Sequence, residues 1–151
     1  MLLDMTIANF KSVKSPQTIS FEALRDNRFP ESKVVAVTEK LKIIKTAAII
    51  GPNGAGKSSF VRALEALKSI VCATSEEVAN PLSVLAGTSF AYSEEKGQPA
   101  TISIRVYMGL DEESGDSVVA HYTLKSDRTM IWEESLYHMV GRSKKRMFER
   151  K

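Results

Sequence analysis

The residues best suited to chemistry lie in a glycine-rich stretch, AAIIGPNGAGKSS, at positions 47–59. The stretch follows the pattern G-x-x-x-x-G-K-S, and its fixed positions are Gly51, Gly56, Lys57 and Ser58. Glycine lets the backbone turn tightly and approach an anion without a Cβ in the way. The N–H groups of such a loop, and the positive end of a helix after it, converge on the α- and β-phosphates of a nucleotide. The pattern therefore predicts a phosphate-binding loop.

Two side chains in this loop have predicted roles. Lys57 would reach the β- and γ-phosphates as a point charge, and the Ser58 hydroxyl would ligate Mg²⁺. The alternative is a glycine-rich turn between a strand and a helix that holds no ligand.

The neighbouring segments favour the nucleotide interpretation. Ala47 to Ile50 is a short apolar run of the kind that forms a buried strand. Lys57 to about Cys72 is predicted to be a helix, because apolar residues recur at i, i+3 and i+4 spacing. These residues are Phe60, Ala63, Leu64, Leu67 and Val71. A phosphate loop needs this order of strand, loop and helix.

Alternating apolar and polar residues predict strands on both sides of the loop. Before it, residues 1–10 and 17–21 are expected to form a hairpin, and residues 34–37 and 41–44 are short apolar runs. After it, residues 101–108 and 118–124 alternate and flank a strong turn signal at residues 111–116, and residues 130–132 would add a third strand. Residues 23–33 and 73–83 are expected to be loops, or a short helix in the second case.

This order predicts the fold class. One strand–loop–helix unit is present, and no series of βαβ units follows it. Parallel sheets seldom contain half-polar strands, so a large antiparallel component should accompany the phosphate-binding core. We expect an α/β fold in which a mixed sheet is joined to an antiparallel β subdomain.

Composition sets broad limits on the protein. A chain of 151 residues can bury one core, and its net charge of +3 is too small to argue for nucleic-acid binding alone. The single cysteine excludes an internal disulfide framework and fits a reducing compartment. No apolar run approaches a membrane span and no signal-peptide pattern is present, so we expect a cytoplasmic protein without a membrane partner.

The motifs together resemble the N-terminal lobe of an ABC-type ATPase of the RecF, SMC and OLD-nuclease kind. Within that group, the sequence is most similar to the AAA-type ATP-binding proteins of bacterial defence loci. The resemblance rests on Asn9-Phe10-Lys11-Ser12 after the first strand, on Gln17-Thr18-Ile19-Ser20, and on Lys45-Thr46-Ala47-Ala48-Ile49 before the phosphate loop. It extends to residues 134–136 and 148–150.

The resemblance implies that the chain is lobe I of a P-loop NTPase and binds ATP with Mg²⁺. It divides the chain into a β-rich part at 1–46, a strand–loop–helix at 47–72, an antiparallel hairpin region at 88–138 and a basic tail at 139–151. Lys57 would be the catalytic residue, and Ser58 the metal ligand. The residues implied to contact the nucleotide are Asn9, Lys11, Asn53, Gly54, Ala55, Gly56, Lys57, Ser58 and Ser59.

The family also implies a second half that carries a signature sequence, a Walker B strand ending in Asp-Glu and a switch histidine. We find no such strand after the loop, and interpret Asp111 to Glu113 as part of a turn and Glu133-Glu134 as an acid pair at the end of a strand. We interpret His121 and His138 as structural. The implied partners are a C-terminal lobe or a second copy of the head, an effector nuclease and DNA. We expect the chain alone to bind Mg·ATP weakly or not at all, and to hydrolyse it negligibly.

Three other functions compete with this interpretation. The Arg- and Lys-rich end could belong to a nucleic-acid-binding module, although such runs are more often solvated or disordered. The chain could be a regulatory fragment with a vestigial loop that occupies the dimer face of a partner ATPase. It could also be a complete small kinase or GTPase, for which we find no base-specificity motif or acceptor-site acid.

Overall fold

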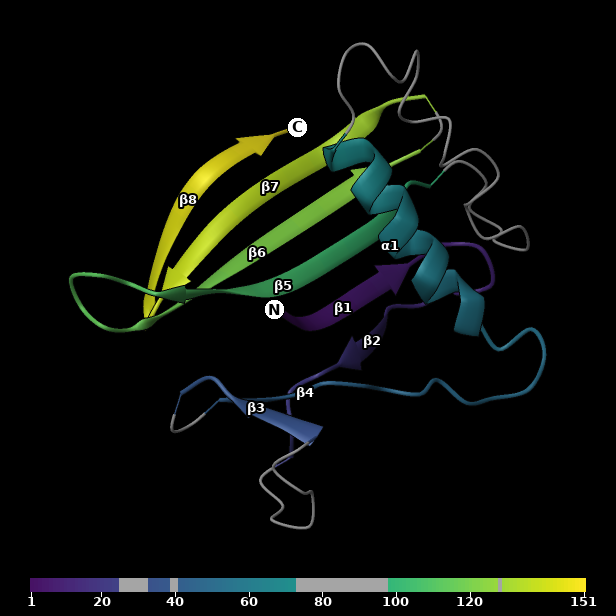
Figure 1. The fold of residues 1–151 in the computed structure, drawn as a ribbon. Helices are drawn as coiled ribbons and strands as arrows, with labels where there is room; N and C mark the ends of the chain where they lie inside the picture. Colours follow the sequence, from purple (N-terminus) through teal and green to yellow (C-terminus); the bar gives the residue numbers. More distant parts are fainter. Residues whose placement is uncertain (25–32, 39–40, 73–97, 128) are drawn as a thin grey trace.

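Among the residues that the computed structural model describes, the fold is mostly β with one helix. The structure describes residues 1–24, 33–38, 41–72, 98–127 and 129–151. Within these residues, six strands form an antiparallel sheet in the order β2-β1-β5-β6-β7-β8, and α1 crosses one face of it (Figure 1). The elements are β1 (Leu2–Ala8), β2 (Gln17–Ser20), β3 (Val34–Ala36), β4 (Lys42–Ile44), α1 (Lys57–Val71), β5 (Ala100–Leu110), β6 (Ser117–Ser126), β7 (Ile131–Val140) and β8 (Ser143–Arg150).

The core lies between α1 and the face of the sheet that it covers. Alternation puts Met5 and Ile7 of β1 on this face, beside Ile102 of β5, and all three side chains are buried. The helix packs on them through Ala63 and Leu67, which are also buried. The predicted helix and the predicted strands of β1, β2, β5 and β6 are confirmed.

The opposite face of the sheet is polar. Arg105 of β5 forms ion pairs there with Asp4 of β1 and with Glu22, which follows β2. The hydrogen bond to Asp4 and the charge of both acids raise the pKa of the Arg105 guanidinium, against the effect of its own burial. On the same face, the Ser103 hydroxyl and His121 Nε2 are 2.9 Å apart. These contacts tie β1, β5 and β6 together across the sheet.

The C-terminal third of the chain is more regular than the sequence indicates. The strand expected at residues 130–132 runs on to Val140 as β7, and the expected basic tail forms β8, which pairs with β7 along its length. Every residue of β8 is exposed, and four of its eight residues are Lys or Arg. Apolar residues do not alternate along this strand, so its sequence resembles that of a solvated chain end. Its backbone is nevertheless hydrogen-bonded to β7.

The strand predicted at Ala47 to Ile50 is wrong. This segment belongs to no sheet and is exposed, with Ile49 at 43% and Ile50 at 92% of full accessibility. An apolar strand is buried only when neighbouring strands hydrogen-bond to it and helices cover its faces. The described residues provide no such neighbours at this position.

The expected mixed sheet is therefore not seen among the described residues, where every strand pair is antiparallel. The two short apolar runs before the loop form the separate β3–β4 hairpin, which is joined to the end of β2 by a bridge between Glu22 and Ile43. The loops expected at 23–33 and 73–83 lie largely or wholly outside the described residues. No described helix is long and apolar enough to cross a membrane.

Candidate phosphate-binding site

A cavity of about 360 Å³ lies where the glycine-rich loop enters α1. Two parts of the chain that are far apart in sequence form its walls: the turn after β1, and the loop with the first two turns of α1. The described residues that line it are Lys11, Ser12, Asn53, Gly54, Gly56, Lys57, Ser58, Ser59 and Arg62. Seven of these nine residues are among those expected to contact a nucleotide.

Two glycines give the loop its shape. Gly54 and Gly56 have φ values of +83° and +89°, a region that residues with a Cβ rarely adopt. Gly56 is also the residue just before α1, and a Cβ there would lie 2.9 Å from Cγ2 of Val13. The loop can therefore lie against the turn after β1 only with glycine at position 56.

The turn after β1 is held by its own hydrogen bonds. Phe10 and Val13 exchange backbone hydrogen bonds of 2.9 Å, and both side chains are buried in the core. Lys11, at the tip of the turn, has a φ of +51°. The adjacent hydroxyl of Ser12 is 2.9 Å from the hydroxyl of Ser59, on the first turn of α1. This side-chain contact joins the two walls of the cavity.

Lys57 is bonded to the loop itself. Its Nζ donates to the carbonyl oxygens of Gly51 and Pro52, at 2.7 Å each. Neither partner carries a full charge, and within the described residues Lys57 forms no ion pair with an acid. An incoming anion could therefore compete for the ammonium group.

The electrostatics of the cavity favour anions. Lys11, Lys57 and Arg62 line it, and none of the described lining residues is acidic. The first turn of α1 also lacks an acid, and no described side chain caps the N–H groups there. Three cations and the positive end of a 15-residue helix thus act on the same volume.

Two of the expected nucleotide contacts do not line the cavity. The Asn9 side-chain amide donates to the carbonyl oxygens of Gln98, at 2.7 Å, and Pro99, so it joins the end of β1 to the start of β5. The N–H of Ala55 donates to the carbonyl of Pro52 at 3.3 Å, inside the loop. Binding roles for the remaining residues stay predictions.

One lining residue carries a charge that the sequence analysis did not consider. Arg62 lies four residues after Ser58, which puts the two side chains on neighbouring positions of the helix surface. The i, i+4 spacing from Ser58 was the only sign in the sequence that Arg62 could belong to the site. Such spacing does not show which residues lie beside the loop.

The acid pairs of the sequence are engaged elsewhere. Glu133 pairs with Lys125 at 2.6 Å, and Asp111 accepts hydrogen bonds from the backbone and hydroxyl of Ser114, which hold the pKa of its carboxyl below the usual range. Neither acid lines the phosphate cavity. The interpretation of Asp111 as part of a turn is confirmed, but Glu133 and Glu134 lie inside β7 and not at the end of a strand as expected.

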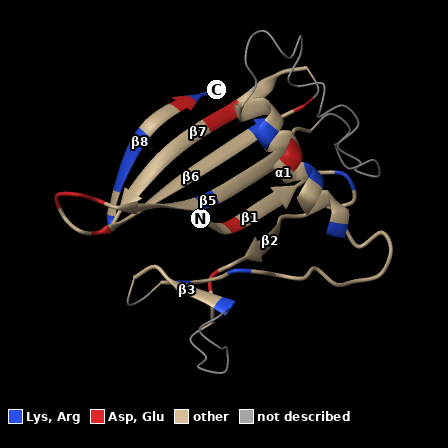
Figure 2. Ribbon diagram, viewed as in Figure 1, with Lys and Arg blue, Asp and Glu red and all other residues tan. Residues whose placement is uncertain are grey.

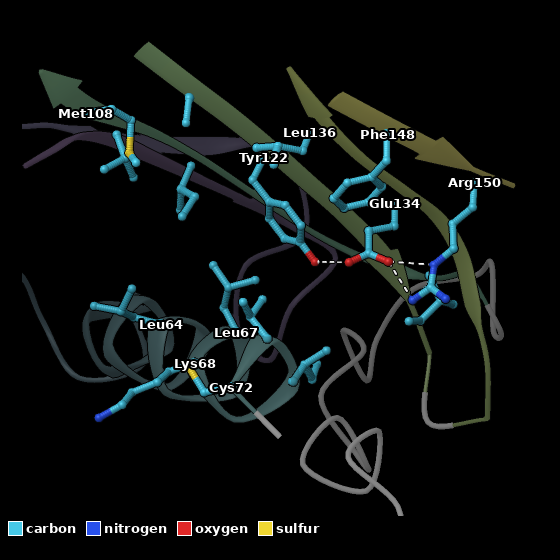
Figure 3. A pocket seen from close by; sticks show the side chains of 16 residues that line it. Leu64, Leu67, Lys68, Cys72, Met108, Tyr122, Glu134, Leu136, Phe148 and Arg150 are labelled. Carbon is cyan, nitrogen blue, oxygen red and sulfur yellow. Dashed lines mark hydrogen bonds and ion pairs between the residues drawn. The ribbon is translucent and has the colours of Figure 1, made fainter. Parts of the chain in front are cut away.

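Glu134 belongs to a different cavity, an apolar groove of about 850 Å³ between α1 and the sheet (Figure 3). Its carboxylate accepts a hydrogen bond of 2.5 Å from Tyr122 and one of 2.6 Å from Nε of Arg150. Burial, together with this acid, raises the pKa of the Tyr122 hydroxyl. The groove is lined chiefly by aliphatic and aromatic residues, including Leu67 and Phe148, and offers little to a polyphosphate.

The histidines and acids of the described residues form no metal site. No group of three or more His, Cys, Asp or Glu side chains among them is placed to hold a metal ion. His121 instead contacts Ser103, and its burial lowers its pKa.

Comparison with known proteins finds similarity only among solved structures. No protein-family model matches the sequence, and no curated protein is similar to it. Among solved structures, the fold is similar to that of an SMC ATPase, from work on ATP-driven dimerization and DNA-stimulated activation of these enzymes. The TM-score is 0.43 and the identity 17%, over 97% of this chain and 72% of that one. A similarity this low does not indicate a function, so the function has to be inferred from the geometry of the site.

Replacing the two glycines of the loop by alanine should have different effects on stability. Both substitutions place a Cβ at a positive φ, but a Cβ at Gly54 meets nothing within 4 Å, whereas one at Gly56 meets Val13 at 2.9 Å. We expect Gly56→Ala to lower the free energy of unfolding by about 1–3 kcal/mol more than Gly54→Ala, measured by urea denaturation. Val13→Ala should lower the free energy of unfolding less in the Gly56→Ala background than in the native chain, because there it also relieves the clash. Equal losses in the two glycine variants would contradict the observed packing.

Proposed function

We propose that this chain is the ATP-binding lobe of an ATPase of the ABC type. Mg·ATP occupies the cavity at the start of α1, with its phosphates on the N–H groups of the loop. Lys57 neutralises the β- and γ-phosphates, and Ser58 ligates Mg²⁺. The observation that carries the proposal is the combination of an exposed glycine loop, three lining cations and no described lining acid.

The position of Lys57 supports this role. Its two carbonyl bonds keep the ammonium beside the loop, which is where phosphate oxygens would lie. Exchanging neutral carbonyls for phosphate oxygens pairs the ammonium with negatively charged acceptors, and such N⁺–H···O⁻ hydrogen bonds are short and strong. The lysine is thus held close to its site without a competing acid.

This chain offers Mg²⁺ one protein ligand in the cavity, the hydroxyl of Ser58. Ser58 is exposed and lines the cavity, and within the described residues its hydroxyl has no hydrogen-bond partner. Mg²⁺ usually keeps several waters and takes few protein ligands besides substrate phosphates. One hydroxyl from this chain therefore suits a metal that arrives with ATP. When bound, the metal would offset negative charge on the phosphates.

Hydrolysis should need a further protein segment. The resemblance implies that an acid orients the attacking water, and the described lining residues include no acid. The exposed segment at residues 46–50, which pairs with no described strand, also supports an incomplete core. We propose that a C-terminal lobe completes this core, and that two heads then dimerise around ATP. In the defence-associated proteins that the sequence resembles, such a head would control an effector nuclease or act on DNA.

The protein should bind Mg·ATP weakly and turn it over negligibly. We expect a dissociation constant in the millimolar range, measured from amide shifts of Gly54, Gly56 and Ser59 in a ¹H–¹⁵N NMR titration. Lys57→Ala should raise this constant about tenfold, because the main countercharge on the β- and γ-phosphates is removed. Phosphate release in the same samples should equal that of buffer.

Two outcomes of this titration would contradict the proposal. One is the absence of any shift in the loop amides at saturating Mg·ATP. The other is equal binding by the native chain and Lys57→Ala. Steady turnover that Lys57→Ala abolishes would instead show that the 151-residue chain forms a complete catalytic site.

Nucleic-acid binding is a second candidate, favoured by one observation. Four of the eight residues along β8, an exposed strand at the edge of the sheet, are Lys or Arg (Figure 2). The acidic turn between β5 and β6 lies close to the start of this strand, since Lys145 helps to lower the pKa of Asp111. The turn offsets part of the positive charge, which makes this candidate weaker than the first.

Removing charge from β8 separates the two candidates. If β8 binds DNA, replacing Lys144, Lys145 and Arg146 by Gln should weaken binding. The slope of log K against log salt should also fall by about 3, since each phosphate that is no longer neutralised reduces it by about 0.9. The matched control replaces three lysines of the β3–β4 hairpin region, Lys33, Lys42 and Lys45, which are also exposed. Equal losses of affinity in both triple variants, measured by fluorescence anisotropy, would show that β8 has no specific role.

A further inference from the structure

Arg62 is a charged residue of the phosphate cavity for which the fold offers no structural role. Its side chain lines the cavity and is exposed on the second turn of α1. It forms no hydrogen bond or ion pair with any described residue, and this includes Glu65, the acid three positions further along the helix. By contrast, Arg105, Arg146 and Arg150 each pair with an acid.

The three cations of the cavity differ in how they are held. Lys57 is engaged with two loop carbonyls. Lys11 and Arg62 come from the two opposite walls, one from the turn after β1 and one from α1, and the Ser12–Ser59 contact fixes these walls relative to each other. An anion that enters the cavity therefore meets two cations that need not break a bond first.

We propose that Arg62 contacts the polyphosphate chain of the ligand directly and, with Lys11, captures it before Lys57 leaves its carbonyl partners. This inference rests on the proposed function and adds a residue to that site. A guanidinium presents a planar set of N–H donors that can grip two oxygens of a phosphate chain at once. The recognised group is the polyphosphate, so inorganic tripolyphosphate should bind through the same residue and adenosine should not.

The test compares Arg62→Ala with two further variants in NMR titrations with Mg·ATP and with inorganic tripolyphosphate. The matched control is Lys68→Ala, which removes one positive charge from the last turn of the same helix, outside the cavity. The conservative variant is Arg62→Lys. Arg62 is exposed, so these variants should fold, and the native pattern of amide peaks confirms this for each.

Arg62→Ala should raise the dissociation constants of both ligands about tenfold, the effect expected when a charge-assisted hydrogen bond is removed. Arg62→Lys should recover part of the affinity, and Lys68→Ala should change either constant less than about twofold, because a distant exposed charge is screened.

The outcomes that overturn the inference differ from those that overturn the proposed function. If Arg62→Ala binds both ligands as the native chain does while Lys57→Ala loses binding, Arg62 has no role and the ATP site stands. If Arg62→Ala weakens ATP but not tripolyphosphate, Arg62 does not recognise the polyphosphate. If the native chain binds neither ligand, both proposals fail.

Discussion

The site depends on one contact, between the turn after β1 and the start of α1. Val13 fills the space that a side chain at Gly56 would need, and Ser12 and Ser59 meet through their hydroxyls at 2.9 Å. The turn is anchored by the burial of Phe10 in the same core that holds the inner face of α1. The loop is thereby fixed to the sheet at one end, and Lys11 and Arg62 face one volume from two elements. A change at this contact should alter both the stability of the fold and the shape of the cavity.

The glycine-rich loop lies directly after an exposed apolar segment that pairs with no described strand. Ile50, one residue before the loop, is almost fully exposed, while Gly56 and Ser59 are buried. Exposed backbone and side chains of this kind lose the free energy that strand pairing and apolar burial provide. The loop keeps its shape because its glycines and its contact with Val13 are local. A partner segment that pairs with residues 46–50 would therefore add stability without having to build the loop.

Local signals in the sequence predicted the parts of the structure that depend on local chemistry. The loop and α1 follow from the glycine spacing and the helical periodicity, and the turn at residues 111–116 follows from its Asp and Gly residues. The strand at residues 47–50 was predicted wrongly, since its burial depends on neighbours that the described chain does not provide. β8 was not predicted because its sequence is rich in charged residues and lacks the apolar alternation typical of a strand, although it pairs with β7. Within the site, Asn9 was expected to contact the nucleotide but does not line the cavity, whereas Arg62 lines it and was not expected. Spacing along the chain does not reveal which side chains reach the cavity.

The central claim is that this loop holds a polyphosphate and that Lys57 moves onto it. The most direct measurement is a crystal structure of the protein grown with millimolar Mg²⁺ and a non-hydrolysable ATP analogue. We expect a triphosphate in the cavity at the start of α1, with Lys57 Nζ within hydrogen-bonding distance of its oxygens and no longer bonded to Gly51 and Pro52. A cavity without the analogue, in which Lys57 keeps both carbonyl partners, would contradict it.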